Sequence, residues 1–138
     1  MSGKFTFLTD AALDKLGEIR EFVKSAAHNY ALDEVPISDL ILAVDEAVTN
    51  TIVHGYKGRG GAIQVHFEFD GAAAIVRLRD EAPGFDPCSY LNMDLKDALE
   101  KDTPGGFGLH LIKKSVDELS YRIPEEGGNE LTLVKRIA

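Results

Sequence analysis

Apolar residues recur every three or four positions between Leu40 and Gly55, which is typical of an amphipathic helix. At about 100° per residue, one broad stripe of this helix is apolar and is expected to face the core. The stripe consists of Leu40, Ile41, Val44, Ala47, Val48, Thr51 and Ile52. Ser38 or Asp39 is expected to cap the start of the helix, and Gly55 to end it.

Two polar residues, Glu46 and Asn50, lie one turn apart on the other side of this helix, so their side chains are neighbours. A polar patch on a surface helix is the simplest interpretation of such a pair. The residues beside it, Leu42, Ala43 and Val53, are however apolar, whereas a solvated face normally carries charges. These flanks favour a covered site.

Two elements are predicted before the central helix. The alternation from Lys4 to Leu8 indicates a short strand. Thr9 and Asp10 then offer a cap to a helix whose apolar residues continue at helical spacing as far as Tyr30. Asp33 to Pro36 is expected to connect the two helices, because proline disfavours helix in the residue before it.

The clearest strand follows the central helix, where Ile63 to Phe69 alternates strictly between apolar and polar residues. Asp70-Gly71 is a hairpin signal. The run from Ala73 to Arg79 should therefore pair antiparallel with this strand and leave Asp80 at its end.

The remainder of the chain begins with a polar, glycine- and proline-containing segment from Glu81 to Gly106. Long loops of this kind are often functional lids, and Pro87 to Pro104 is expected to form one, with a short helix from Leu95 to Lys101. A helix is predicted for Phe107 to Val116, followed by two strands at Leu119 to Ile123 and Leu131 to Ile137. The whole pattern predicts an α+β two-layer sandwich, with a mixed, mostly antiparallel sheet and helices on one face.

Composition and charge narrow the class of protein. A chain of 138 residues fits one domain, over residues 1–138, with one core. The net charge is −8 and no basic stripe is present, so nucleic acid is not expected as a direct partner. The single cysteine, Cys88, excludes an internal disulfide and a cysteine-based zinc site. With no apolar run of membrane-spanning length and no signal peptide, we expect a cytoplasmic protein that does not contact a membrane.

A glycine-rich segment opens the helix predicted from Phe107, and free N–H groups at the start of a helix bind phosphate. The P-loop pattern nearly appears from Gly108 to Ser115, but Lys113 holds the place of its second glycine. The dinucleotide pattern starts at Gly106 and meets Leu111 where its third glycine belongs. Neither of these phosphate motifs is present.

Three segments in order carry a more specific pattern: Asp45-Glu46-Ala47-Val48-Thr49-Asn50, Asp80-Glu81-Ala82-Pro83-Gly84-Phe85-Asp86 and Gly105-Gly106-Phe107-Gly108-Leu109. Together they resemble the ATP-binding boxes of the GHKL superfamily, which includes gyrase, Hsp90, histidine kinases and MutL. With His54-Gly55-Tyr56 after the first segment, the chain is most similar to the anti-sigma factor serine/threonine kinases. It departs from the usual pattern at Ala82, where many members have glycine, and no basic residue immediately precedes Gly105.

The resemblance implies a site for ATP and Mg²⁺. Asp80 would accept a hydrogen bond from the adenine amino group, and Thr132 would be a second contact on the adenine side. Asn50 would be the Mg²⁺ ligand, and Glu46 the catalytic base. The other residues that would contact the nucleotide are Gly84, Gly105, Gly106, Phe107, Gly108 and Leu109.

Simpler interpretations exist for several of these residues. Asp80 would also serve as a turn-capping aspartate, and Thr132 as an ordinary strand residue. His54 could line the site or cap the end of the helix. Lys57 and Arg59 could help to hold phosphates, although a solvated loop explains them as well.

The resemblance further implies an ATP-dependent serine/threonine protein kinase that acts as an anti-sigma factor. It would phosphorylate a STAS-type anti-anti-sigma antagonist, bind a sigma factor and form a homodimer. The helical hairpin of a histidine kinase and the transducer domain of gyrase or MutL would not fit within this length. The alternative is a non-catalytic module that holds ATP or ADP and a partner; the carboxylate of Glu46 favours the kinase, because a binding module needs no base.

Overall fold

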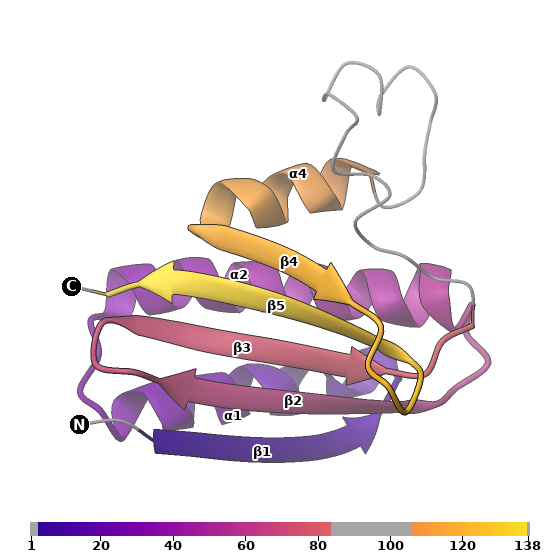
Figure 1. The fold of residues 1–138 in the computed structure, drawn as a ribbon, viewed down its shortest axis with the longest axis horizontal. Coiled ribbons are helices and arrows are strands. Elements are labelled where there is room, and N and C mark those ends of the chain that lie inside the picture. Colours follow the sequence, from indigo (N-terminus) through magenta and orange to yellow (C-terminus); the bar gives the residue numbers. More distant parts are fainter. Residues whose placement is uncertain (1–2, 84–105, 138) are drawn as a thin grey trace.

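The structure is a computed structural model that describes residues 3–83 and 106–137. Figure 1 shows how its elements are arranged. In chain order they are strand β1 (Gly3–Asp10), a 3₁₀ turn (Leu13–Lys15), helices α1 (Leu16–His28) and α2 (Glu34–Asn50), a π-helical turn (Thr51–Gly55), strands β2 (Ala62–Phe69) and β3 (Ala73–Asp80), helix α4 (Gly106–Ser115), and strands β4 (Glu118–Arg122) and β5 (Asn129–Arg136).

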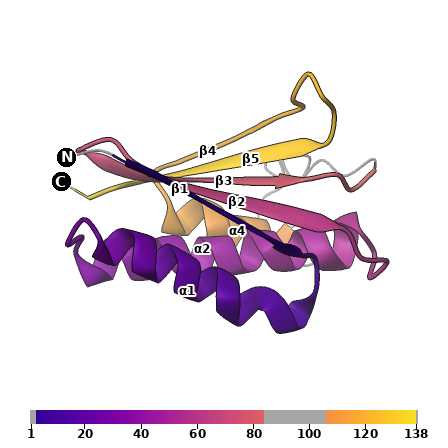
Figure 2. The ribbon, with the colours of Figure 1, turned by 90° about the horizontal axis from the view of Figure 1, so that it is seen from below.

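The five strands form one sheet in the order β1-β2-β3-β5-β4. All three helices lie on one face of this sheet, as Figure 2 shows, so the predicted α+β two-layer sandwich is confirmed. Every strand pair is antiparallel, so the sheet of the described residues is not mixed. The hairpin expected at Asp70-Gly71 joins β2 to β3, and the Asp70 carboxylate accepts the N–H groups of Ala72 and Ala73.

The core lies between the helices and the sheet. Successive strand residues point to opposite faces, so alternate residues of β2 and β3 enter the core. The largest fully buried side chains of these two strands and of α2 are Ile63, Val65, Phe67, Val76, Leu40, Val44 and Val48. The opposite face is polar, and on it the buried carboxylate of Glu130 lies between the guanidinium groups of Arg79 and Arg122.

Helix α2 begins at Glu34, so the expected cap at Ser38 or Asp39 is wrong. Asp33, with an extended backbone, holds the N-cap position. Pro36 lies in the first turn of the helix, where its missing N–H would have had no partner within the helix. The chain from Asp33 to Pro36 is therefore largely the start of the helix and not a connection.

The core face of α2 also differs from the expected stripe. Ala43 is fully buried, whereas Ile41 is only partly buried. The cause is that α2 contacts α1 and α4 as well as the sheet, so more than one side of the helix is covered.

Strand β1 continues to Asp10, so Thr9 and Asp10 are strand residues and not the expected helix cap. A 3₁₀ turn then leads into α1, which starts only at Leu16, and Leu13 is left exposed.

The C-terminal elements α4, β4 and β5 lie within two residues of their predicted bounds. The short helix expected from Leu95 to Lys101 and the lid from Pro87 to Pro104 fall outside the described residues. None of the helices in the described ranges is long and apolar enough to cross a membrane.

The packing of α2 gives a test of the core. Leu40 is 0% exposed, and Leu40→Ala should lower the free energy of unfolding by about 2–5 kcal/mol, because it removes buried methyl groups and leaves a cavity. Leu42 on the same helix is 42% exposed, so Leu42→Ala is the matched control and should have a much smaller effect. Urea unfolding of both variants measures the difference. Equal losses would contradict this placement of α2.

Candidate functional site

The fold brings the described parts of the three motif segments to one end of the molecule. The C-terminal end of α2, the C-terminal end of β3 and the N-terminal end of α4 all lie at the same end in Figure 1. Helix α2 also packs directly against α4. Residues that are far apart in the sequence therefore surround one region on the helical side of the sheet.

Asn50, the last residue of α2, is buried although it carries an amide. Its Nδ2 atom has no hydrogen-bond partner within the part of the chain that the structure describes. Glu46 lies one turn earlier and is partly buried. Asn50 is thus covered, but the apolar flanks do not explain it, because Leu42 and Val53 are each 42% exposed.

An unpaired buried amide fits the binding of a cation such as Mg²⁺. A rotation of the amide exchanges its oxygen and nitrogen, so Asn50 can present Oδ1 to a cation without breaking any hydrogen bond seen in the described residues. No cluster of three or more His, Cys, Asp or Glu residues in those ranges could hold a metal ion by itself. Mg²⁺ suits such a place, because it takes few protein ligands and completes its shell with water and phosphate oxygens.

The π-helical turn directly after Asn50 positions Tyr56. Its wider ring is closed by the N–H of Tyr56, which donates to the carbonyl of Thr51 at 2.8 Å. The Tyr56 hydroxyl donates to the carbonyl of Ala62 at 2.7 Å and accepts the N–H of Glu81 at 2.8 Å. Tyr56 therefore ties the end of the helical segment to the start of β2 and to the chain just after β3.

Gly61 makes room for this tyrosine. A Cβ atom at Gly61 would lie 2.2 Å from the Tyr56 ring, so a larger residue there would displace the ring.

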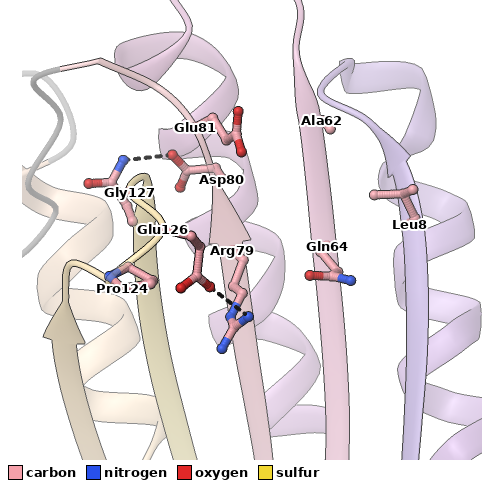
Figure 3. Close-up of a pocket in the computed structure, with 10 residues that line it drawn as sticks. Leu8, Ala62, Gln64, Arg79, Asp80, Glu81, Pro124, Glu126 and Gly127 are labelled. Atoms are coloured by element: carbon pink, nitrogen blue, oxygen red, sulfur yellow. Dashed lines mark hydrogen bonds and ion pairs between the residues drawn. The ribbon is translucent and has the colours of Figure 1, made fainter.

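Asp80 ends β3 and lies opposite Asn129, the first residue of β5. Its Oδ1 atom accepts the N–H of Ala82 at 2.9 Å and Nδ2 of Asn129 at 2.8 Å, the second of which is drawn in Figure 3. Within the described residues, Oδ2 accepts no hydrogen bond. Burial raises the pKa of Asp80, and the two N–H groups oppose that rise without cancelling it.

Thr132 does not lie beside Asp80. It is opposite Arg77 and Ser120, on the sheet face that points away from the helices. Asn129 is the β5 residue next to Asp80, and the sequence analysis missed it. The alternation would have excluded Thr132, because Leu131 and Leu133 face the core and the β5 residue beside Asp80 must therefore be odd-numbered; the register identifies it as Asn129.

The turn before β5 approaches Asp80 closely at Gly128. Its φ is +80°, and a Cβ atom there would lie 2.4 Å from the Asp80 carbonyl oxygen. Both the backbone conformation and the space require glycine at this position.

The remaining expected residues are placed only in part. Gly84 and Gly105 lie outside the described residues. The backbone of Gly106, Phe107, Gly108 and Leu109 forms the first turn of α4. Lys57 and Arg59 are exposed in the loop after the π-helical turn, whereas His54 is partly buried within that turn.

A hollow of about 220 Å³ lies at the same end of the sheet. Figure 3 shows Leu8 and Arg79 on its wall, and these residues belong to the face opposite the helices. Asp80 and Asn129 also line this hollow, whereas Glu46 and Asn50 do not. The hollow therefore reaches Asp80 from the other face of the sheet, and Glu46 and Asn50 belong to the region between α2, β3 and α4.

The latter region combines four chemical capabilities. The Asp80 carboxylate can accept a hydrogen bond from an amino group, and the Asn50 amide can bind a cation. The Glu46 carboxylate can accept a proton. The free N–H groups at the start of α4 suit a phosphate.

Comparison with known proteins agrees with this geometry. Residues 9–135 match the family described as the histidine kinase-like ATPase domain. The chain is 31% identical over 100 residues to the serine/threonine-protein kinase BtrW of Bordetella bronchiseptica, covering 72% of this chain and 70% of that protein. It is 27% identical over 104 residues to the anti-sigma F factor of Clostridium kluyveri, covering 75% of this chain and 72% of that protein.

A solved structure shares the fold. The crystal structure of the RsbU and RsbW domains of Rv1364c from Mycobacterium tuberculosis aligns with 98% of this chain at a TM-score of 0.66 and 21% identity. This chain covers 32% of that longer protein. The family match over most of the chain, together with the shared fold and the motif segments gathered at one end, shows that the chain belongs to the histidine kinase-like ATPase family, in the branch of the anti-sigma serine/threonine kinases.

Proposed function

We propose that this protein is an ATP-dependent serine/threonine protein kinase that acts as an anti-sigma factor. It phosphorylates a STAS-type anti-anti-sigma antagonist and binds a sigma factor, as a homodimer in the cytoplasm. The observation that carries the proposal is the convergence of Asp80, of the pair Glu46 and Asn50, and of the start of α4 at one end of the fold. The printed names of the relatives, a serine/threonine kinase and anti-sigma F factors, support it.

In this proposal Asp80 recognises adenine. An ionised carboxylate accepts a hydrogen bond from the adenine amino group, whereas the carbonyl of guanine at the same position would repel it. The β5 residue beside Asp80 is Asn129 and not Thr132, and its amide donates to the Asp80 carboxylate. The phosphates are held by backbone N–H groups from Gly106 to Leu109, together with Gly84 and Gly105 of the same motif segments.

Asn50 is the proposed protein ligand of Mg²⁺, through its amide oxygen. When bound, Mg²⁺ neutralises charge on the phosphates. Within the described residues, Nδ2 of Asn50 has no hydrogen-bond partner, so a rotation of the amide can place Oδ1 at that position without the loss of a hydrogen bond, which supports this role.

Glu46 is the proposed general base. Its carboxylate takes the proton of a serine or threonine hydroxyl on the antagonist, and the hydroxyl oxygen forms a bond to the γ-phosphorus of ATP. The bond from that phosphorus to the oxygen that bridges the β- and γ-phosphates breaks, and ADP leaves with the electron pair. The products are ADP and the phosphorylated antagonist, with the proton on Glu46.

The first prediction of this proposal concerns nucleotide preference. Asp80→Asn should weaken ATP binding at least about tenfold and reduce the preference for ATP over GTP, because a hydrogen bond to a charged acceptor is lost. Asp70→Asn is the matched control, since the Asp70 carboxylate also accepts two N–H groups, both from the backbone, but lies in the hairpin at the other end of β3. Calorimetry measures both. Equal affinity of the wild type for ATP and GTP would refute the assignment.

The same substitution should increase stability in the absence of nucleotide. Burial raises the pKa of folded Asp80 above its unfolded value, so this group stabilises the fold below the unfolded pKa and loses that contribution as the pH rises through the folded pKa. Asp80→Asn carries no charge to bury. At pH 7 it should melt at a higher temperature than the wild type, and the gain should disappear toward acidic pH.

The third prediction separates the kinase from the non-catalytic module. Glu46→Gln should bind ATP normally but transfer phosphate to the antagonist roughly 10²- to 10⁴-fold more slowly, because it removes the base. Asn50→Ala should instead impair Mg²⁺-dependent binding and transfer together. The exposed Glu125 lies in the turn between β4 and β5, and Glu125→Gln serves as the control. An unchanged rate in Glu46→Gln would remove the proposed base, and no transfer by the wild type to any STAS partner would favour the binding module.

A further inference from the structure

Three side chains on adjacent strands form a continuous chain of hydrogen bonds that ends at Asp80. Tyr121 of β4 donates its hydroxyl hydrogen to Oδ1 of Asn129 at 2.7 Å. Nδ2 of Asn129 donates to Oδ1 of Asp80 at 2.8 Å and to the carbonyl of Ala82 at 2.9 Å. Both amide hydrogens and the amide oxygen of Asn129 are thus used.

This arrangement fixes the orientation of the Asn129 amide. In the opposite orientation, Oδ1 of Asn129 would face the Asp80 carboxylate and the Ala82 carbonyl. All three groups are acceptors only, so no hydrogen bond could form between them. Asn129 is 6% exposed, so water does not readily substitute for the lost bonds. The Tyr121 hydroxyl donates to Oδ1 of Asn129, the other buried polar atom of this amide, and polarises the amide toward Asp80.

The hydrogen bonds also make the two oxygens of Asp80 unequal. Oδ1 accepts two N–H groups, one from Ala82 and one from Asn129, which occupies both of its lone pairs. Oδ2 is therefore the oxygen that remains for a ligand, and it is also the atom that would take up a proton. A protonated Oδ2 is a donor, so protonation would reverse what Asp80 recognises, from an amino group to a carbonyl.

We propose that Asn129, held by Tyr121, is the positioning residue that keeps Asp80 an ionised acceptor through Oδ2, and thereby sets the preference for adenine over a base that carries a carbonyl at that position. The inference deepens the proposed function and rests on it. Neither residue touches the nucleotide in this role: both act through Asp80.

The surroundings of Asp80 make this support necessary. Burial disfavours its charge, and so does the charge of Glu81, the next residue in the chain. Tyr56, at the end of the π-helical turn, is the other titratable group whose charge is coupled to that of Asp80 in the described residues. Arg79 and Glu130 carry charges nearby, but they pair with each other on the opposite face of the sheet. The donation by Asn129 is the main opposing influence, followed by the N–H of Ala82.

The test compares ADP with IDP, whose base differs from adenine by a carbonyl in place of the amino group and by a proton on the adjacent ring nitrogen. Affinities are measured by calorimetry between pH 5 and pH 8 for the wild type, Tyr121→Phe and Asn129→Leu. We expect the wild type to keep its preference for ADP over IDP down to a lower pH than either variant does. At mildly acidic pH, Asn129→Leu should lose about tenfold or more of the preference, and Tyr121→Phe less, because only the former removes the hydrogen bond to the charged group.

Two further measurements keep the outcome clear. Tyr30→Phe is the matched control, because Tyr30 packs against Phe5 and Phe69 at the other end of the sheet and should leave the pH profile unchanged. The ¹³C shift of the Asp80 carboxyl reports the titration of this group directly, without nucleotide. The midpoint of that titration should lie at a higher pH in both test variants than in the wild type. This readout also decides the case if Asn129→Leu does not fold, since Tyr121→Phe removes a single oxygen.

The outcomes separate the two proposals. If the wild type does not prefer ADP at neutral pH, the adenine site itself is refuted. If it does, but the variants lose affinity for ADP and IDP equally with no change in pH profile or in the Asp80 titration, then Asn129 and Tyr121 have a merely structural role and the inference is refuted.

Discussion

The structure depends on the burial of α2 against the helix-facing side of the sheet. Leu40, Val44 and Val48 belong to one core cluster with alternate residues of β2 and β3, all of them nearly inaccessible to solvent. This packing fixes the position of the end of α2 relative to the end of β3. Since Glu46 and Asn50 lie on α2 and Asp80 lies on β3, the geometry of the candidate site follows from a hydrophobic contact in which none of its polar groups takes part.

Much of this fold could be predicted from the sequence because the spacing of apolar residues along the chain was clear. The strict alternation of Ile63 to Phe69 and the Asp70-Gly71 signal led to the antiparallel β2–β3 hairpin, which the structure confirms. The boundaries of the first two helices could not be obtained in the same way. Pro36 suggested a break, but in the first turn of a helix proline loses no hydrogen bond, and only the tertiary structure decides between the two.

The site was predictable only as far as local patterns reach. The neighbourhood of Glu46 and Asn50 follows from helical spacing, and the position of Asp80 follows from the end of a strand. The burial of Asn50 arises because α2 is covered on more than one side, which no single amphipathic pattern reveals. The partner of Asp80 depends on the register of β5 against β3, so Asn129 emerged only when that register was known, in the place given to Thr132.

The π-helical turn after Asn50 has a consequence for how this protein can change in length. A π turn holds one residue more than an α-helical turn, so the segment from Thr51 to Gly55 contains an additional residue that an uninterrupted α-helix would not need. Removing one residue there would restore a regular helix but rotate Tyr56 by about 100° about the helix axis. Its hydroxyl would then leave both Ala62 and Glu81, and two loops would lose their common anchor. The number of residues in this segment is thus constrained by the two hydrogen bonds of Tyr56.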